Sequence, residues 1–109
     1  MGEDKQLFIL TGGIKTPPMS KEARRTTGQL LRKLQQGDSL TAPYSKRIRT
    51  IGPRCHELRI RDNRVIWRVF YRIDSDAIIV IKVFKKETQR IPSHVIDTCR
   101  QRLKNYDAE

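Results

Sequence analysis

Three segments near the middle of the chain alternate hydrophobic and polar residues in the manner of β-strands. They cover residues 55–61, 65–73 and 77–84. The residues between them, Asp62-Asn63 and Asp74-Ser75-Asp76, are typical of tight turns. Turns this short join neighbouring strands that run in opposite directions, so the pattern predicts an antiparallel meander.

Helical spacing of apolar residues predicts one helix before this meander and one after it. Ser20 is suited to cap the start of the earlier helix, and Gly37 is suited to end it. Gly28 lies inside that helix, where a glycine either weakens the helix or allows close packing. Pro92 is suited to begin the later helix. The residues at helical spacing are Ala23, Thr27, Leu30, Leu31 and Leu34, and then Val95, Ile96, Cys99, Leu103 and Tyr106.

The ends of the meander are extended by two shorter segments. Residues 5–11 predict a mostly buried first strand that Gly12-Gly13 would end, and residues 45–49 predict a short extended piece. Thr16-Pro17-Pro18 is extended and unsuited to a helix interior. The order of elements predicts one α+β domain over residues 1–109, with an antiparallel sheet packed against helices.

Side chains alternate across a sheet, so each strand of the meander has two faces. One face is apolar and is predicted to pack under the helices. Its residues are His56, Leu58 and Ile60, then Trp67, Val69, Tyr71 and Ile73, then Ile79, Ile81 and Val83. The opposite face is predicted to remain open to solvent. Its residues are Glu57, Arg59 and Arg61, then Arg68, Phe70 and Arg72, then Lys82 and Phe84.

The open face combines one carboxylate with several cations and two aromatic rings, which suits a phosphodiester substrate. Cations hold a phosphate and stabilise the charge that develops on it. Glu57 is the candidate proton acceptor, and Arg68 is the candidate phosphate ligand. The rings of Phe70 and Phe84 would stack on bases. The alternative is a solvated face with cross-strand ion pairs, such as Glu57 with Arg68.

The charge of the chain supports an anionic partner. Lys and Arg number 23 against 12 Asp and Glu, which gives a formal net charge of +11. Residues 45–90 hold 13 basic and 5 acidic side chains, and residues 20–36 hold 5 basic and 1 acidic. Such an excess favours nucleic acid or an acidic protein as partner, with a basic surface that merely maintains solubility as the alternative.

The cysteines and the N-terminus bear on compartment and cofactors. Cys55 and Cys99 are too few for a disulfide scaffold and have no metal ligands at suitable spacing. The longest apolar run, residues 77–81, is far shorter than the roughly 20 residues of a membrane span. No leader of signal-peptide length opens the chain. We expect a cytoplasmic protein with reduced thiols and no membrane contact, metal or cofactor.

Three stretches occur in a fixed order before Pro92. They are Gly52-Pro53-Arg54-Cys55-His56-Glu57-Leu58-Arg59-Ile60, Trp67-Arg68-Val69-Phe70-Tyr71-Arg72 and Val83-Phe84-Lys85-Lys86-Glu87-Thr88-Gln89. Over about residues 44–106 the chain resembles the RelE/HigB superfamily of type II toxin–antitoxin toxins, and more closely its phage-derived HigB-like branch. The resemblance implies a small RelE-like α+β fold and an endoribonuclease that cuts mRNA in the ribosomal A site. The implied reaction is attack of the 2′-hydroxyl on the adjacent phosphate, and the implied partner is an antitoxin, often of the helix-turn-helix type.

The resemblance also assigns roles to single residues. The implied catalytic residues are Glu57, Arg59, Arg68 and Lys86. The residues expected to bind RNA around them are Arg61, Arg72, Lys82, Phe70, Phe84, Lys46 and Arg47. Several relatives use a tyrosine or histidine near the last strand, where this chain has Ile91-Pro92. His94 is expected on the helix surface and His56 in the core, so no general acid is identified.

Two other functions stay open from the sequence. A toxin of the same fold can bind a protein target, as the gyrase-poisoning ParE relatives do, and that function would not need Glu57 among cations. A non-catalytic basic RNA-binding module is the other alternative, because the sequence identifies no general acid.

Overall fold

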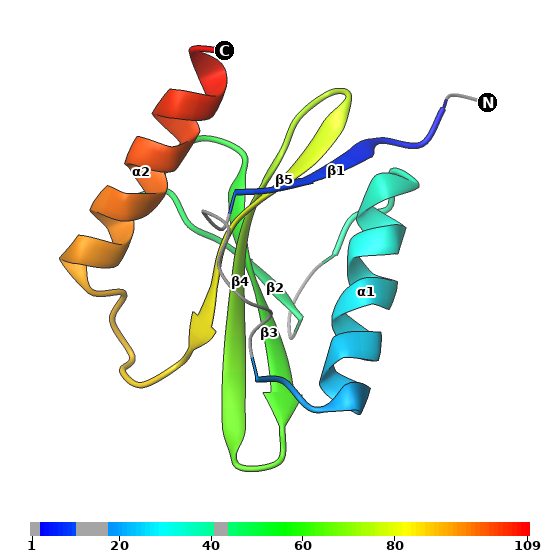
Figure 1. Ribbon diagram of the computed structural model, residues 1–109, viewed down its shortest axis with the longest axis vertical. Helices are drawn as coiled ribbons and strands as arrows, with labels where there is room; N and C mark the ends of the chain where they lie inside the picture. The colour runs from blue at the N-terminus through cyan, green and yellow to red at the C-terminus, as the bar shows by residue number, and fades with distance from the viewer. Residues whose placement is uncertain (1–2, 11–17, 41–43) are drawn as a thin grey trace.

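The strands and helices of the protein form three layers, with one sheet between two helices (Figure 1). The computed structural model describes residues 3–10, 18–40 and 44–109. The strands are β1 (Gln6–Ile9), β2 (Ser45–Arg47), β3 (Cys55–Asp62), β4 (Val65–Ile73) and β5 (Ala77–Lys85). The helices are α1 (Lys21–Gln35) and α2 (Ser93–Asp107). The predicted α+β fold is confirmed, as are the three strands of the meander and both helices.

The sheet has the order β1-β5-β4-β3-β2. Strands β2 to β5 pair with antiparallel neighbours, but β1 runs parallel to β5. The sheet is therefore mixed rather than wholly antiparallel as predicted. A parallel pair needs a long connection, and the segment from Ile9 to Ala77, which includes α1, provides it.

The start of α1 is tied to the turn between β3 and β4. The Ser20 hydroxyl accepts a hydrogen bond from the Ala23 amide at 3.1 Å, as expected of an N-cap. The Ser20 amide donates to Asp62 Oδ2 at 2.8 Å, and Trp67 Nε1 donates to the same oxygen at 3.1 Å. The bond from the Ser20 amide lowers the pKa of Asp62. One carboxylate thus orients the first turn of α1 against the sheet.

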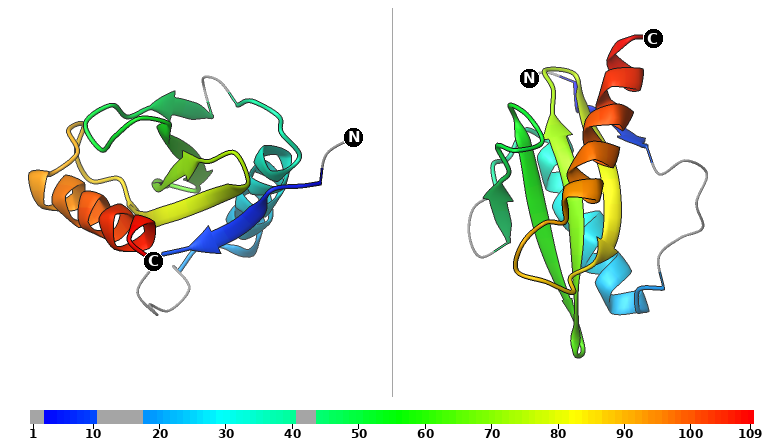
Figure 2. Two further views of the ribbon diagram at one scale, coloured as in Figure 1. Left: turned by 90° about the horizontal axis from the view of Figure 1, so that it is seen from above. Right: turned by 90° about the vertical axis from the view of Figure 1, so that its left-hand side faces the viewer.

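Each face of the sheet packs against one helix, so the protein has two hydrophobic cores (Figure 2). The core under α1 includes Leu30, Leu34, Leu58, Ile60, Trp67, Val69, Tyr71, Ile78 and Val80. The core under α2 includes Cys55, Phe70, Ala77, Ile79, Ile81, Val95, Cys99 and Leu103. Both helices were expected on one face, and this expectation is wrong.

The covering of the second face by α2 overturns the expected exposure of its residues. Phe70 is 0% exposed, compared with 4% for Trp67 on the opposite face. Phe84 is half-buried and meets Phe70 edge-on, with 4.9 Å between ring centroids. Arg68 and Arg72 are buried as well. The predicted open face is therefore largely a second core, although the alternation that places these residues together is correct in β3 and β4.

A register shift in β5 changes which of its residues share a face. Phe70 pairs with Lys82, whereas the next residue, Tyr71, pairs with Val80. Ile81 is the extra residue at this irregularity, and Ile79 and Ile81 both lie in the core under α2. Their predicted position beside Trp67 is wrong, because strict alternation fails across a β-bulge.

The first strand is more exposed than predicted. Phe8 is 39% and Ile9 is 57% exposed, because β1 lies at the edge of the sheet. The Phe8 ring contacts the Tyr106 ring of α2, with 5.9 Å between centroids. The predicted turn at Gly12-Gly13 and the residues Thr16-Pro17 lie outside the described part of the chain.

Both cysteines are buried and free. Burial raises the pKa of the Cys55 thiol and of the Cys99 thiol to about 11, which keeps both protonated at neutral pH. Among residues 3–10, 18–40 and 44–109, no helix is long and apolar enough to cross a membrane.

The burial of Phe70 gives a direct test of the second core. Phe70→Ala should lower the free energy of unfolding by about 3–5 kcal/mol, because it leaves a cavity under α2. Phe84→Ala should cost less, because that ring is already half-exposed. Urea denaturation of the two variants measures the difference. An unchanged unfolding midpoint for Phe70→Ala would contradict the packing of α2 on this ring.

Candidate functional site

A basic pocket of about 350 Å³ lies beside the core under α2. Its walls come from β2 and the loop that follows it, from β3 and β4, and from the connection between β5 and α2. The cations that line it are Lys46, Arg47, Arg49, Arg59 and Arg68, and the carboxylate is Glu57. The pocket thus keeps the combination of one acid with several cations that the sequence pattern predicts.

A buried ion pair joins Glu57 to Arg68 across β3 and β4. Glu57 Oε2 lies 2.5 Å from Arg68 Nε, and the two side chains are only 3% and 2% exposed. The contact is an ion pair rather than a well-aligned hydrogen bond. The second oxygen, Oε1, accepts a hydrogen bond of 3.3 Å from Arg59 Nε, and Arg68 Nη2 donates to the Gln89 carbonyl at 3.3 Å. Both guanidinium groups are therefore held toward one carboxylate.

Strand register explains this arrangement. Arg59 pairs directly with Arg68, and Glu57 lies diagonally across from Arg68 because it pairs with Phe70. Lys46 of β2 pairs with Glu57 from the other side. Two arginines face each other across the strands, and the carboxylate between them offsets their repulsion. The ion pair that the sequence left as an alternative is present, and it orders Arg68.

Other predicted residues lie near the pocket or away from it. Lys86 Nζ lies 3.5 Å from Gln89 Oε1, so Lys86 adjoins the pocket through a residue that lines it. Lys82 is half-buried, with Nζ 5.8 Å from the centre of the Phe84 ring. Arg61 is exposed at the far end of β3. Among the two rings expected to stack on bases, Phe70 has no exposed surface with which to do so.

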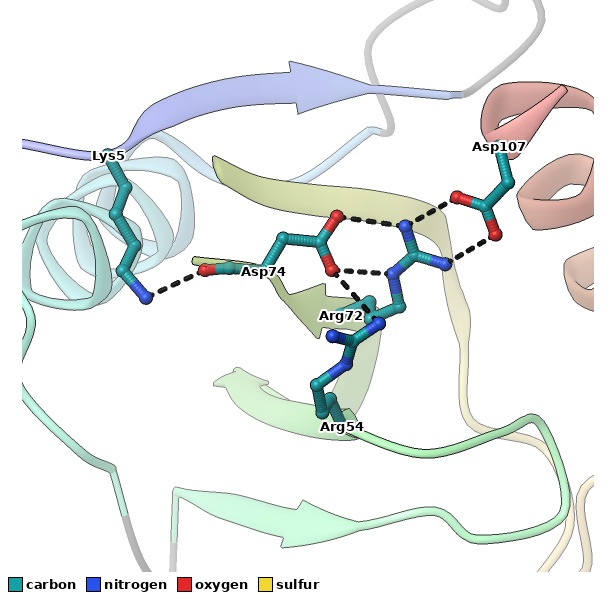
Figure 3. Close-up of polar contacts among 5 residues, drawn as sticks. All are labelled: Lys5, Arg54, Arg72, Asp74 and Asp107. Carbon is teal, nitrogen blue, oxygen red and sulfur yellow. Dashed lines mark hydrogen bonds and ion pairs between the residues drawn. The ribbon is translucent and has the colours of Figure 1, made fainter. Parts of the chain in front are cut away.

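Arg72 lies in a separate ionic network that fastens α2 to the sheet (Figure 3). Its Nε and Nη2 donate to the two oxygens of Asp74, each at 2.8 Å. Nη1 and Nη2 donate to Asp107, at the end of α2, at 2.9 and 2.8 Å. Arg54 approaches Asp74 at 3.6 Å, and Lys5 Nζ donates to the Asp74 carbonyl at 2.7 Å.

This network leaves Arg72 little capacity for RNA. The hydrogen bonds to Asp107 and Asp74 raise the pKa of Arg72, and the bonds from Arg72 lower the pKa of Asp107. Two carboxylates already accept four hydrogen bonds from the guanidinium. The structure therefore places Arg72 in a structural role and outside the pocket.

Tyr44 is an aromatic residue beside the pocket that the sequence analysis did not single out. It is 52% exposed, and its carbonyl accepts a hydrogen bond of 3.0 Å from the Arg59 amide. This bond continues the pairing of β2 with β3, so alternation places Tyr44 on the same face as Lys46 and Glu57. The signal was present, because Tyr44 stands two residues before Lys46 in a short extended segment.

His94 lies on the helix surface as expected, whereas His56 is half-buried rather than fully in the core. His56 stacks on Tyr71 with 5.4 Å between ring centroids. Burial lowers the pKa of His56, and the nearby positive charge of Arg47 lowers it further. His94 is exposed in the first turn of α2. Within the residues that the structure describes, no group of three or more His, Cys, Asp or Glu side chains could hold a metal ion.

Comparison with known proteins identifies a family. The family Phage derived protein Gp49-like (DUF891) matches residues 18–104, which include α1, the basic pocket and most of α2. No curated protein matches the chain. The match confirms the phage-derived character of the resemblance, and the HigB-like branch stays a prediction.

The burial of the ion pair predicts a strong coupling between its two residues. Arg68→Met leaves Glu57 buried without its counter-ion and should lower the free energy of unfolding by about 3–5 kcal/mol. This corrects the expectation of an exposed Arg68, whose replacement would be nearly neutral. The double variant Glu57→Gln/Arg68→Met removes both charges and should cost less than the two single variants together.

Urea denaturation of the wild type, the two single variants and the double variant measures this coupling. Losses that simply add would show that the two side chains do not stabilise each other.

Proposed function

Because the chain belongs to the phage-derived Gp49-like family, we propose that it is the toxin of a toxin–antitoxin pair and an endoribonuclease. The observation that carries the proposal is the basic pocket, where a buried, oriented arginine is surrounded by further cations and one carboxylate. Burying an arginine is unfavourable for folding. Its position in a pocket wall suggests a functional reason, because an arginine held there can bind an anion.

Arg68 is the proposed ligand of the scissile phosphate. Glu57 and the Gln89 carbonyl fix its guanidinium through Nε and Nη2, which leaves further N–H groups for a phosphate. A guanidinium donates two parallel hydrogen bonds to phosphate oxygens and so recognises their geometry as well as their charge. These bonds strengthen as negative charge grows on the non-bridging oxygens in the transition state.

Glu57 is the proposed base for the attacking 2′-hydroxyl. Among the described residues, its Oε1 is held only by the 3.3 Å bond from Arg59, and a phosphate that draws Arg59 away would free this oxygen. The 2′-oxygen then forms a bond to phosphorus while the bond from phosphorus to the 5′-oxygen breaks. The 2′-hydroxyl proton passes to Glu57, and the Lys86 ammonium donates a proton to the leaving 5′-oxygen, which departs as a 5′-hydroxyl.

The surroundings of the pocket suit single-stranded RNA. Lys46, Arg47 and Arg49 would hold the phosphates on either side of the cut. The exposed ring of Tyr44 would stack on a base, the role that the buried Phe70 cannot perform. We propose ribosome-bound mRNA in the cytoplasm as the substrate.

Mapping of mRNA ends after induced expression tests the proposed cleavage. Arg68→Lys keeps a positive charge beside Glu57 but loses the planar pair of donors, so cleavage should fall roughly 10²-fold. Arg59→Ala should also reduce cleavage, and Arg64→Gln, in the turn between β3 and β4, is the control of equal charge change. Each variant is first checked for folding by circular dichroism.

Two results would contradict the proposal. Full cleavage by a folded Arg68→Lys and Arg59→Ala would remove the pocket from the reaction. Growth inhibition without new mRNA ends would favour a protein target such as gyrase.

The antitoxin should cover the basic pocket in the resting complex. An acidic or amphipathic segment fits this charge, so affinity should fall as salt rises from about 0.1 to about 0.5 M. Co-expression with the neighbouring gene, followed by titration calorimetry at both salt concentrations, measures this. An affinity that does not change with salt would argue against a charged contact.

A further inference from the structure

The outer face of α1 is a second concentration of positive charge. Figure 2 shows α1 on the opposite side of the sheet from α2. The cations of α1 are Lys21, Arg24, Arg25, Arg32 and Lys33, all of them exposed, and the helix contains one acidic residue, Glu22. The positive charge of residues 20–36 therefore lies on α1, and none of these side chains lines the basic pocket.

Gly28 lies in the middle of this face. Arg24 and Arg25 precede it by one helical turn, and Arg32 follows it by one turn. A Cβ at Gly28 would meet no atom within 4 Å, and Gly28 is not among the glycines with positive φ. The close packing that the sequence allowed for Gly28 is therefore absent from the described fold.

The fold thus leaves the glycine unexplained. Glycine is the least favourable residue in a helix interior apart from proline, so an exposed glycine lowers the stability of α1. A residue without a side chain does allow another molecule to approach the helix backbone closely. Three arginines within one turn of that point would meet the same molecule.

We propose that the outer face of α1 binds the phosphate backbone of a structured RNA, with Gly28 at the point of closest approach. Arginines that surround a gap suit phosphates, which accept paired hydrogen bonds and approach closely. The choice of RNA over DNA rests on the proposed function. The pocket and this face lie on different sides of the sheet, so a folded RNA on α1 leaves the pocket free for a single strand.

An acidic protein fits the face less well. Protein interfaces centre on apolar or aromatic anchors. The large hydrophobic residues exposed in the described part of the chain are Phe8, Ile9 and Tyr44, and none lies on α1. The face offers charge and a gap without an anchor, which is the chemistry of backbone recognition in nucleic acids.

The ion pair of Arg32 with Asp4 suggests a variant that should strengthen RNA binding rather than weaken it. Arg32 Nη2 lies 2.5 Å from Asp4 Oδ2, and both side chains are about half-exposed. An exposed pair of this kind is weak, so a phosphate can take the arginine from it. Removal of the Asp4 charge should therefore strengthen RNA binding, whereas removal of an arginine should weaken it.

The test measures binding of a blunt RNA duplex of about 20 base pairs by fluorescence anisotropy over a range of salt concentrations. Gly28→Gln should raise the thermal midpoint by roughly 4 °C and weaken duplex binding about tenfold. Arg25→Gln should weaken binding and reduce the salt slope by about one phosphate contact. Asp4→Asn should tighten binding.

Matched controls separate this face from the pocket. Lys104→Gln on α2 removes the same charge and should change affinity less than twofold or so. Arg59→Ala in the pocket should keep duplex binding while its cleavage is reduced. A wild type that cleaves mRNA but does not bind the duplex would overturn this inference and leave the proposed function standing.

Three further results would overturn the inference. One is a Gly28→Gln variant that binds the duplex as tightly as the wild type. Another is tighter binding of a DNA duplex of the same length. The third is displacement of the duplex by a polyglutamate peptide at equal charge, which would assign the face to an acidic protein.

Discussion

The buried ion pair between Glu57 and Arg68 is the interaction on which the arrangement of the site depends. The second face of the sheet carries arginines, and a helix can cover such a face only where their charges are neutralised. Glu57 neutralises Arg68 at a distance of 2.5 Å, where both side chains are nearly inaccessible to water. The same contact fixes the position of the Arg68 guanidinium, which forms part of the wall of the basic pocket.

Two arginines of β4 thus have different roles. Arg72 donates four hydrogen bonds to Asp74 and Asp107 and fastens the end of the helix to the sheet. Arg68, four residues earlier on the same face, is held by one carboxylate and one carbonyl, and it lines a pocket of about 350 Å³. Arg72 therefore stabilises the packing of α2 on the sheet, whereas Arg68 is a candidate anion ligand.

Much of this fold follows from the sequence, because helical spacing and strand alternation each report a local physical requirement. The N-cap at Ser20 and the grouping of Glu57 with Arg59 and Arg68 are examples. The exposure of a face depends instead on what packs against it, and alternation alone does not tell which face the stripe of α2 covers. The buried state of Phe70 was missed for that reason.

The remaining errors have equally specific causes. The register shift beside Phe70 adds one residue to β5, and no local pattern marks it. Tyr44 precedes β2, which is only three residues long, so alternation is a weak signal there and the hydrogen bond from the Arg59 amide is needed to assign its face. The carboxylate partner of Arg72 on α2 is 35 residues away in sequence, beyond the reach of strand periodicity.

The chemistry of the RNA ends tests the central claim most directly. Attack by the 2′-hydroxyl leaves a 2′,3′-cyclic phosphate on the upstream fragment and a 5′-hydroxyl on the downstream fragment. We predict these ends from the wild type, and no cleavage where the nucleotide before the cut carries a 2′-O-methyl group. Cleavage of the methylated RNA, or fragments with 5′-phosphates, would contradict the account.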